Sequence, residues 1–133
     1  MAIDKLMIKD FIILNCIGKD DKIGLYINEK FFIHELKYEI FKKDQLVSII
    51  LNLVKKYKIN LDNKFSIIVN RGPGSFSSIR TSFSVAKGMQ ISKNTNLYSY
   101  NNSDLAQFDL VNIELLISRG LIQNKLINPI YLS

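Results

Sequence analysis

The sequence predicts an α/β protein built around a mixed β-sheet, and two observations carry this prediction. Three β-type runs separated by short turns open the chain, and β-branched runs then alternate with stretches whose apolar residues have helical spacing. Parallel strands need a long crossover connection, usually a helix, whereas antiparallel strands need only a tight turn. The first three strands are therefore expected to be antiparallel and the later ones parallel.

The first three strands are predicted from apolar runs with turn residues between them. Phe11 to Ile17 is a strand of buried type, and Gly18 to Asp21 is a turn. Lys22 to Ile27 forms the second strand. After a turn at Asn28 to Lys30, Phe31 to Lys37 returns as the third, which completes a meander.

A helix is predicted from Asp44, a good N-cap residue, to Tyr57. Its apolar residues at helical spacing are Leu46, Ile49, Ile50, Leu53, Val54 and Tyr57. The remaining elements are a strand at 65–70, a helix at 76–91, a strand at 96–100 and a short helix from Asn102 or Ser103. The resulting order is βββαβαβα. Leu110 to Ile127 is apolar and weakly helical, with a break at Arg119-Gly120.

Length and composition indicate a globular domain. The chain has 133 residues, of which 47% are hydrophobic and 23% charged. Neither a membrane span nor a secretory leader is visible, so we expect a cytoplasmic protein that does not use a membrane. Residues 1–10 are expected to be a leader of uncertain order. The net charge of +6 permits an acidic partner such as RNA without requiring one.

The residue inventory excludes several kinds of chemistry. His34 is the only histidine and Cys16 the only cysteine, so multi-histidine and multi-cysteine metal sites and an internal disulfide are excluded. A Ser-His-Asp triad would have to use His34, which lies in a predicted strand. Asp20-Asp21 is interpreted as a turn. We therefore expect no metal, no cofactor and no catalytic residue.

The segment Arg71 to Phe76 is the most informative stretch, because it joins a β-branched strand to a helix through a Gly-Pro-Gly turn. Free backbone N–H groups at a helix N-terminus favour an anion, and glycine permits close approach or positive φ. The candidate anion-binding residues are Arg71, Gly72, Pro73, Gly74, Ser75 and Arg80. The alternative is a structural connection that binds nothing. Either way, we expect at least one of the two glycines to have a φ that alanine cannot adopt.

The run from Asn70 to Met89 resembles the signature of the bacterial TsaB (YeaZ) family. That signature is Gly-Pro-Gly-Ser-Phe-Thr-Gly-Leu-Arg, a short spacer and Ala-Lys-Gly. The matching residues here are Gly72, Pro73, Gly74, Ser75, Phe76, Arg80, Ala86, Lys87 and Gly88. Downstream, Leu97 to Ala106 is similar to the family's next strand and helix start, and Pro129 to Leu132 to its closing Pro-x-Tyr-Leu.

The resemblance implies a ribonuclease H-like, actin-like ATPase half domain over residues 11–108, with 109–133 as the remnant of a second half. One departure concerns the end of the first strand. The family has Ile-Asp-Thr-Ser there, and this chain has Leu14-Asn15-Cys16-Ile17. The lost carboxylate at Asn15 argues against metal–nucleotide chemistry and therefore against a stand-alone phosphotransferase.

The resemblance further implies a non-catalytic scaffold subunit that binds a TsaD homologue as a heterodimer. With a TsaE homologue, this complex would form threonylcarbamoyladenosine next to the anticodon of tRNA, which the chain would meet only indirectly. A homodimer of the isolated chain is left open. The expected interface residues are Val47, Ile50, Leu51, Val54, Ser78, Ser82, Val85 and Met89. The alternative function is a small phosphate- or RNA-binding α/β module.

Overall fold

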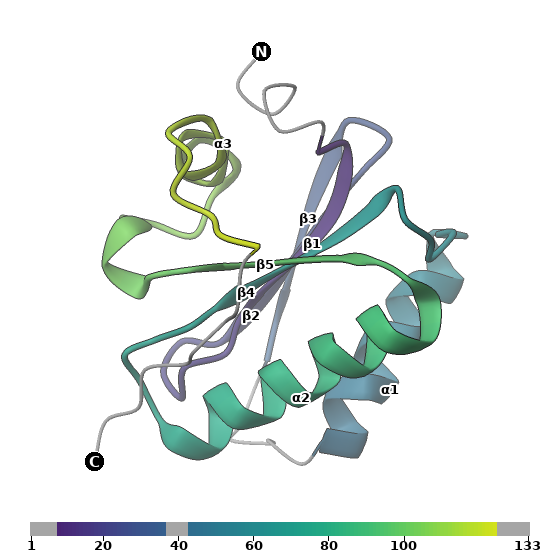
Figure 1. The fold of residues 1–133 in the computed structure, drawn as a ribbon, viewed down its shortest axis with the longest axis horizontal. Helices are drawn as coiled ribbons and strands as arrows, with labels where there is room; N and C mark the ends of the chain where they lie inside the picture. The colour runs from purple at the N-terminus through teal and green to yellow at the C-terminus, as the bar shows by residue number, and fades with distance from the viewer. Residues whose placement is uncertain (1–7, 37–42, 125–133) are drawn as a thin grey trace.

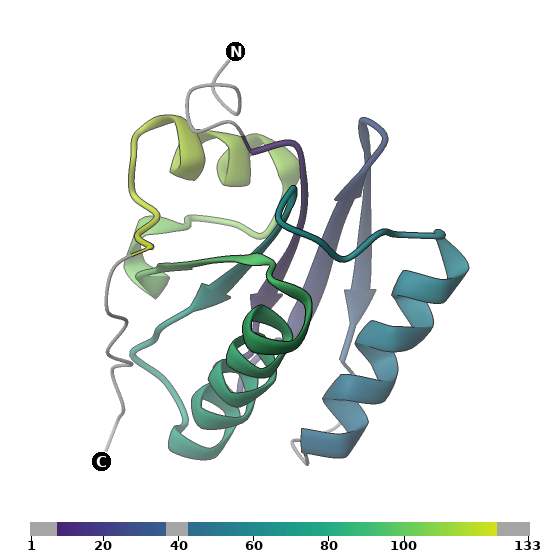
Figure 2. The same ribbon diagram turned by 45° about the vertical axis from the view of Figure 1, so that its right-hand side comes forward.

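The computed structural model describes residues 8–36 and 43–124 and shows a three-layer α/β fold. A five-stranded sheet forms the middle layer, helices α1 and α2 cover one face, and α3 covers the other (Figures 1 and 2). The elements are β1 (Asp10–Asn15), β2 (Lys22–Ile27), β3 (Lys30–Glu35), α1 (Lys43–Lys56), β4 (Phe65–Asn70), α2 (Phe76–Lys93), β5 (Asn96–Tyr100), a 3₁₀ turn η2 (Asn102–Asp104) and α3 (Leu110–Ser118).

The sheet is mixed, as the sequence predicts. Its strand order is β3-β2-β1-β4-β5. The pairs β1–β2 and β2–β3 are antiparallel, whereas β1–β4 and β4–β5 are parallel. The predicted α/β fold class and the predicted directions of the strands are therefore confirmed.

The period-2 alternation of the strands separates two apolar cores. On one face, Ile12 and Leu14 of β1 pack with Ile50 of α1 and Ile79 of α2. On the other, Phe11 and Ile13 pack with Ile68 and Tyr100 and with Ile113, Leu116 and Ile117 of α3. Both faces of β1 and β4 are thus covered, which accounts for the near-continuous apolar runs of these two strands.

Several predicted boundaries shift for identifiable reasons. The strands at 22–27, 65–70 and 96–100 have the predicted bounds, but β1 ends at Asn15 because Ile17 already belongs to the following turn. Helix α2 continues to Lys93 and ends at Asn94, which has a left-handed φ of 59°. Helix α3 ends at Ser118, before the predicted break at Arg119-Gly120, where Gly120 has a φ of +68°.

The two ends of the described chain belong to the same body as the sheet. Ile8 is buried in the core beneath α3, and Asp10 begins β1, so the fold starts before the predicted end of the leader. Residues 1–7 lie outside the described residues. Helix α3, in the segment predicted to be a remnant, packs on the sheet through three buried side chains. The closing Pro129 to Leu132 also lies outside the described residues.

Candidate functional site

The Gly-Pro-Gly turn is held from both sides by hydrogen bonds. The Gly72 N–H donates to Oδ1 of Asn70 at 2.8 Å, and the Gly72 carbonyl accepts from the N–H of Asn102 at 2.9 Å. Gly72 has a φ of +94°, and the Gly72-Pro73 peptide bond is cis. The expectation that one glycine has a φ unavailable to alanine is confirmed at Gly72.

Gly74 is required for a different reason, which is close approach. A Cβ added at Gly74 would lie 2.7 Å from Cβ of Ile17 and 2.9 Å from its carbonyl oxygen. The same Ile17 carbonyl accepts from the N–H of Ser75 at 2.8 Å. Across this contact, a Cβ added at Gly18 would lie 2.5 Å from Cβ of Ser75. The turn after β1 and the turn after β4 therefore interlock.

Asp21 organises the turn after β1. Its Oδ1 accepts from the N–H groups of Ile17, Gly18 and Lys19 at 2.9, 3.0 and 3.1 Å. Burial raises the pKa of this carboxyl, although the same three backbone N–H groups act to lower it. The backbone donors that could face an external anion at this turn are thus already used by a carboxylate of the chain itself. The predicted turn role of Asp20-Asp21 stands, and for Asp21 it gains this specific cause.

A neutral polar cluster closes the carboxyl ends of the central strands. Nδ2 of Asn70 donates to Oδ1 of Asn15 at 2.7 Å and to Oδ1 of Asn102 at 3.0 Å. The Tyr100 hydroxyl donates to the same Asn15 oxygen at 3.2 Å, and burial holds the Tyr100 pKa well above its ordinary value. Asn70 is completely buried. Asn15 thus accepts hydrogen bonds where the resembling family has a carboxylate.

The two candidate arginines are engaged in separate contacts beside the turn. Nη1 of Arg71 lies 3.5 Å from Oε1 of Gln123. The Arg80 guanidinium lies over the Phe76 ring, 5.7 Å from its centroid. Ser75 is the N-cap residue of α2 but makes no side-chain capping bond, and the first turn of the helix has no acidic residue. Whether this helix end binds an anion stays a prediction.

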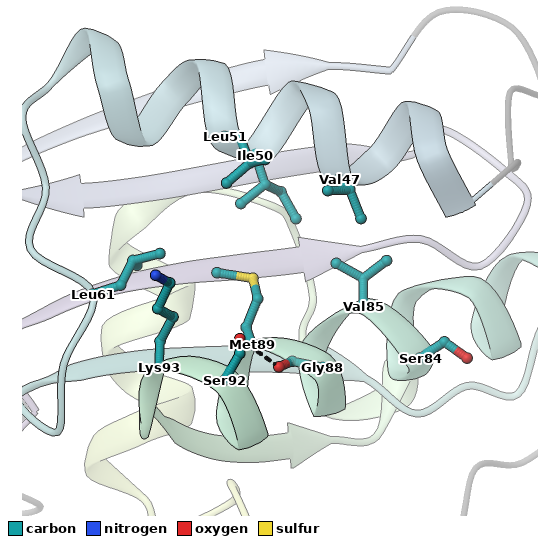
Figure 3. A pocket seen from close by; sticks show the side chains of 10 residues that line it. All are labelled: Val47, Ile50, Leu51, Leu61, Ser84, Val85, Gly88, Met89, Ser92 and Lys93. Atoms are coloured by element: carbon teal, nitrogen blue, oxygen red, sulfur yellow. Dashed lines mark hydrogen bonds between the residues drawn. The ribbon is translucent and has the colours of Figure 1, made fainter.

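An open apolar pocket of about 260 Å³ lies between α1 and α2, and we call it the α1–α2 pocket (Figure 3). Its apolar lining residues are Val47, Ile50, Leu51, Leu61, Val85 and Met89. Ile50 and Val85 form the floor, with exposed fractions of 1% and 3%. Leu51 is on the rim and is 51% exposed. The side chains of both helices point toward the same space between them (Figure 3).

Five of the eight expected interface residues therefore meet at one place, namely Val47, Ile50, Leu51, Val85 and Met89. The other three do not line the pocket. Val54 is half-buried against the core, and Ser78 and Ser82 are buried. The Ser82 hydroxyl donates to the Ile79 carbonyl within α2, so this residue faces inward and does not offer a surface to a partner. The interface itself stays a prediction.

Sequence reasoning missed five pocket residues, which are Leu61, Ser84, Gly88, Ser92 and Lys93. Helical spacing could have found three of them, because 84, 88 and 92 follow one another at intervals of one turn beside Val85 and Met89. Ile91, which is 83% exposed on the same helix, was also missed.

The described residues show little that could hold a metal ion. No group of three or more histidine, cysteine, aspartate or glutamate residues is found within 8–36 and 43–124. His34 is exposed on β3. Cys16 is buried as predicted, and burial keeps the pKa of its thiol far above the ordinary range. In the part of the chain that the structure describes, no helix has the length and apolar character to cross a membrane.

Comparisons with known proteins find similarity at the level of structure. No protein-family model and no curated protein sequence matches the chain. Among solved structures, an uncharacterized protein with similarity to peptidase YeaZ from Pseudomonas aeruginosa superposes with a TM-score of 0.62 at 18% identity. YeaZ from the same organism superposes with a TM-score of 0.60 at 20% identity.

These matches cover 74% and 73% of this chain but only 44% and 46% of the two structures, so the chain spans less than half the length of either. Identity at this level shows the fold alone. The order of the elements, the mixed sheet and these superpositions together show that the described chain has an α/β fold like that of YeaZ, which is of the actin-like ATPase type.

Proposed function

We propose that this chain is a non-catalytic scaffold subunit that acts by binding another protein. The observation that carries the proposal is the α1–α2 pocket, an apolar hollow open to solvent, with Leu51 half exposed on its rim. Covering apolar surface is favourable by about 25 cal/mol per Å². A pocket of this kind on an outer layer is therefore a surface that a partner can complete.

The YeaZ-like fold and the Gly72 to Gly88 signature support a role of the TsaB type. In this role the chain forms a heterodimer with a TsaD homologue and works with a TsaE homologue. The complex forms threonylcarbamoyladenosine next to the anticodon of tRNA, and the chain meets tRNA only through the complex. The pocket between α1 and α2 is the surface that we assign to the TsaD homologue.

The polar strand-end cluster is consistent with a scaffold role. Asn70 uses both its amide and its carbonyl within the chain, and the Tyr100 hydroxyl donates to Asn15. General acid–base chemistry uses groups whose pKa lies near the working pH, and side-chain amides do not titrate there. This cluster holds the turn after β4 in place and offers no proton to a reaction.

The second candidate function is a phosphate- or RNA-binding module at the start of α2. It is favoured by Ser75, which leaves the first turn of the helix without a side-chain cap, and by the absence of acidic residues in that turn. The interlocked packing of Gly18 on Ser75 weighs against it, because this contact fills the space beside the helix end.

Reconstitution separates the two candidates. The purified chain alone is expected neither to hydrolyse ATP nor to modify tRNA, and its addition to cognate TsaD and TsaE homologues is expected to restore modification. The Leu51→Asp variant should keep its circular dichroism spectrum and lose TsaD binding by about tenfold or more, because a charge placed in an apolar interface is strongly disfavoured.

Val111→Asp is the matched control, because Val111 is 67% exposed on α3, which covers the opposite face of the sheet. This variant should bind the TsaD homologue as the parent does. Two results would overturn the scaffold proposal: ATP turnover by the isolated chain that a Gly74→Ala change abolishes, or normal TsaD binding by a folded Leu51→Asp variant.

A further inference from the structure

The helices that form the α1–α2 pocket are mainly cationic, because their sequences contain six lysine or arginine residues and a single carboxylate, Asp44 at the start of α1. Within residues 45–56 and 76–93, whose side chains the structure describes, the charged residues are Lys55, Lys56, Arg80, Lys87 and Lys93. All five are exposed, and neither stretch contains a carboxylate. An apolar hollow is therefore set in a surface layer that is positive throughout these two stretches.

The charge reaches the pocket itself at Lys93. This residue lines the pocket at the same end as Leu61, across from α1 (Figure 3). Asp62 follows Leu61 in the chain, but its Oδ1 accepts from the N–H of Lys64, and Asp62 lines a different hollow together with Asp10. Lys93 is thus the one charged residue among the described residues that line the pocket.

We infer that the α1–α2 pocket binds an apolar side chain of a partner protein whose flanking residues are acidic. This inference rests on the proposed function and specifies the chemistry of the partner at that surface. Its basis is charge complementarity: the apolar lining accepts the apolar side chain, and the Lys93 ammonium at the edge of the pocket pairs with a carboxylate beside it. An amphipathic helix with an apolar stripe and acidic flanks has this chemistry.

A second copy of this chain is the less suitable occupant. Two copies meeting through α1 and α2 would bring two sets of these cations together, in a protein whose net charge is +6. Like charges that face each other across an interface suppress the pairing. RNA would match the cations but not the apolar lining of the pocket.

The test measures binding of the cognate TsaD homologue at low and at high salt. Lys93→Glu should weaken binding by about tenfold at low salt, with a smaller loss at high salt, because charges at the rim of an interface are screened. Arg119→Glu, which makes the same charge change beside α3 on the other face of the sheet, should leave binding unchanged.

The possible results test the proposed function and the acidic partner separately. If the TsaD homologue does not bind the parent chain, the proposed function fails and the inference fails with it. If the parent binds but Lys93→Glu and added salt change nothing, the acidic partner is refuted while the scaffold role stands.

Sedimentation of the isolated chain should show a monomer. A dimer that Leu51→Asp dissociates would instead make a second copy of the chain the occupant of the pocket. Binding of tRNA by the chain alone that Lys93→Glu abolishes would overturn the inference in favour of nucleic acid.

Discussion

The carboxyl ends of the central strands and the α1–α2 pocket differ in how completely other residues of the chain cover them. At the strand ends, Asn70 makes three hydrogen bonds within the chain and has no exposed surface. In the pocket, Leu51 is half exposed beside an apolar hollow. Buried polar groups must be paired for the fold to be stable, whereas an apolar hollow can stay exposed until a partner protein binds there. The α1–α2 pocket is therefore the better candidate for a functional surface.

The largest expected effect comes from breaking the closed region with Asn70→Asp. The carboxylate would face Oδ1 of Asn15 and Oδ1 of Asn102, two acceptors that now receive hydrogen bonds from the Asn70 amide. An uncompensated buried charge costs about 3–5 kcal/mol. We expect a loss of this size in the free energy of unfolding at neutral pH, measured by urea denaturation.

Acid should reduce this loss, because protonation of the new carboxyl removes its charge. Asn52→Asp is the control, since Asn52 is exposed on α1, and this variant should change stability by less than about 1 kcal/mol. An Asn70→Asp variant as stable as the control would show that the cluster is not the closed network described above.

The second prediction compares Gly74, which lies just before α2, with Gly88, which lies within it. Gly74→Ala places a Cβ 2.7 Å from Cβ of Ile17, and we expect a loss of about 1–3 kcal/mol. Gly88 lies within α2 with nothing within 4 Å of an added Cβ, so Gly88→Ala should gain about 1 kcal/mol from helix propensity.

Melting temperatures with and without phosphate or ADP extend this glycine comparison to function. A structural turn predicts that Gly74→Ala melts earlier and that neither protein responds to the ligand. If the parent melts later with phosphate and a still-stable Gly74→Ala variant does not, the turn is an anion site. That result would replace the structural role of the turn with the second candidate function.

The same comparison shows what sequence can and cannot reveal. The β-branched run 65–70 and the Gly-Pro-Gly turn are local signals, and both were found. The polar cluster joins residues separated by 55, 32 and 85 positions, and each of its members is an unremarkable polar residue at the end of a strand or loop. Nothing local distinguishes such residues from solvated ones.

The sequence could predict only part of the pocket, for a related reason. Helical spacing shows that α1 has more apolar residues than one face needs, but it does not show which of them lie on the sheet. Ile50 and Leu51 are neighbours in sequence, yet one is 1% and the other 51% exposed. The sequence therefore identified the helices of the surface, and the rotation of each helix had to come from the structure.

The smallest expected effect concerns the pH dependence at Asp21, which lies next to the closed region. Burial raises the pKa of this carboxyl above its ordinary 3.8, against the opposing effect of three backbone N–H groups. The folded chain therefore holds the Asp21 proton to a higher pH than the unfolded chain does. As pH rises from below 3.8 through the raised value, the unfolded chain releases its proton first, so the contribution of Asp21 to stability falls.

Asp21→Asn removes this titration and leaves one amide oxygen to accept from Ile17 and Gly18. The measurement is the difference in free energy of unfolding between parent and variant across this pH range, because the subtraction removes most of the titration of the other carboxylates. The difference should shift in favour of the variant as pH rises. If it shifts in favour of the parent instead, the three N–H groups outweigh burial. The turn after β1 would then hold an ionised Asp21, whose negative charge would weaken the case for an anion at the neighbouring start of α2.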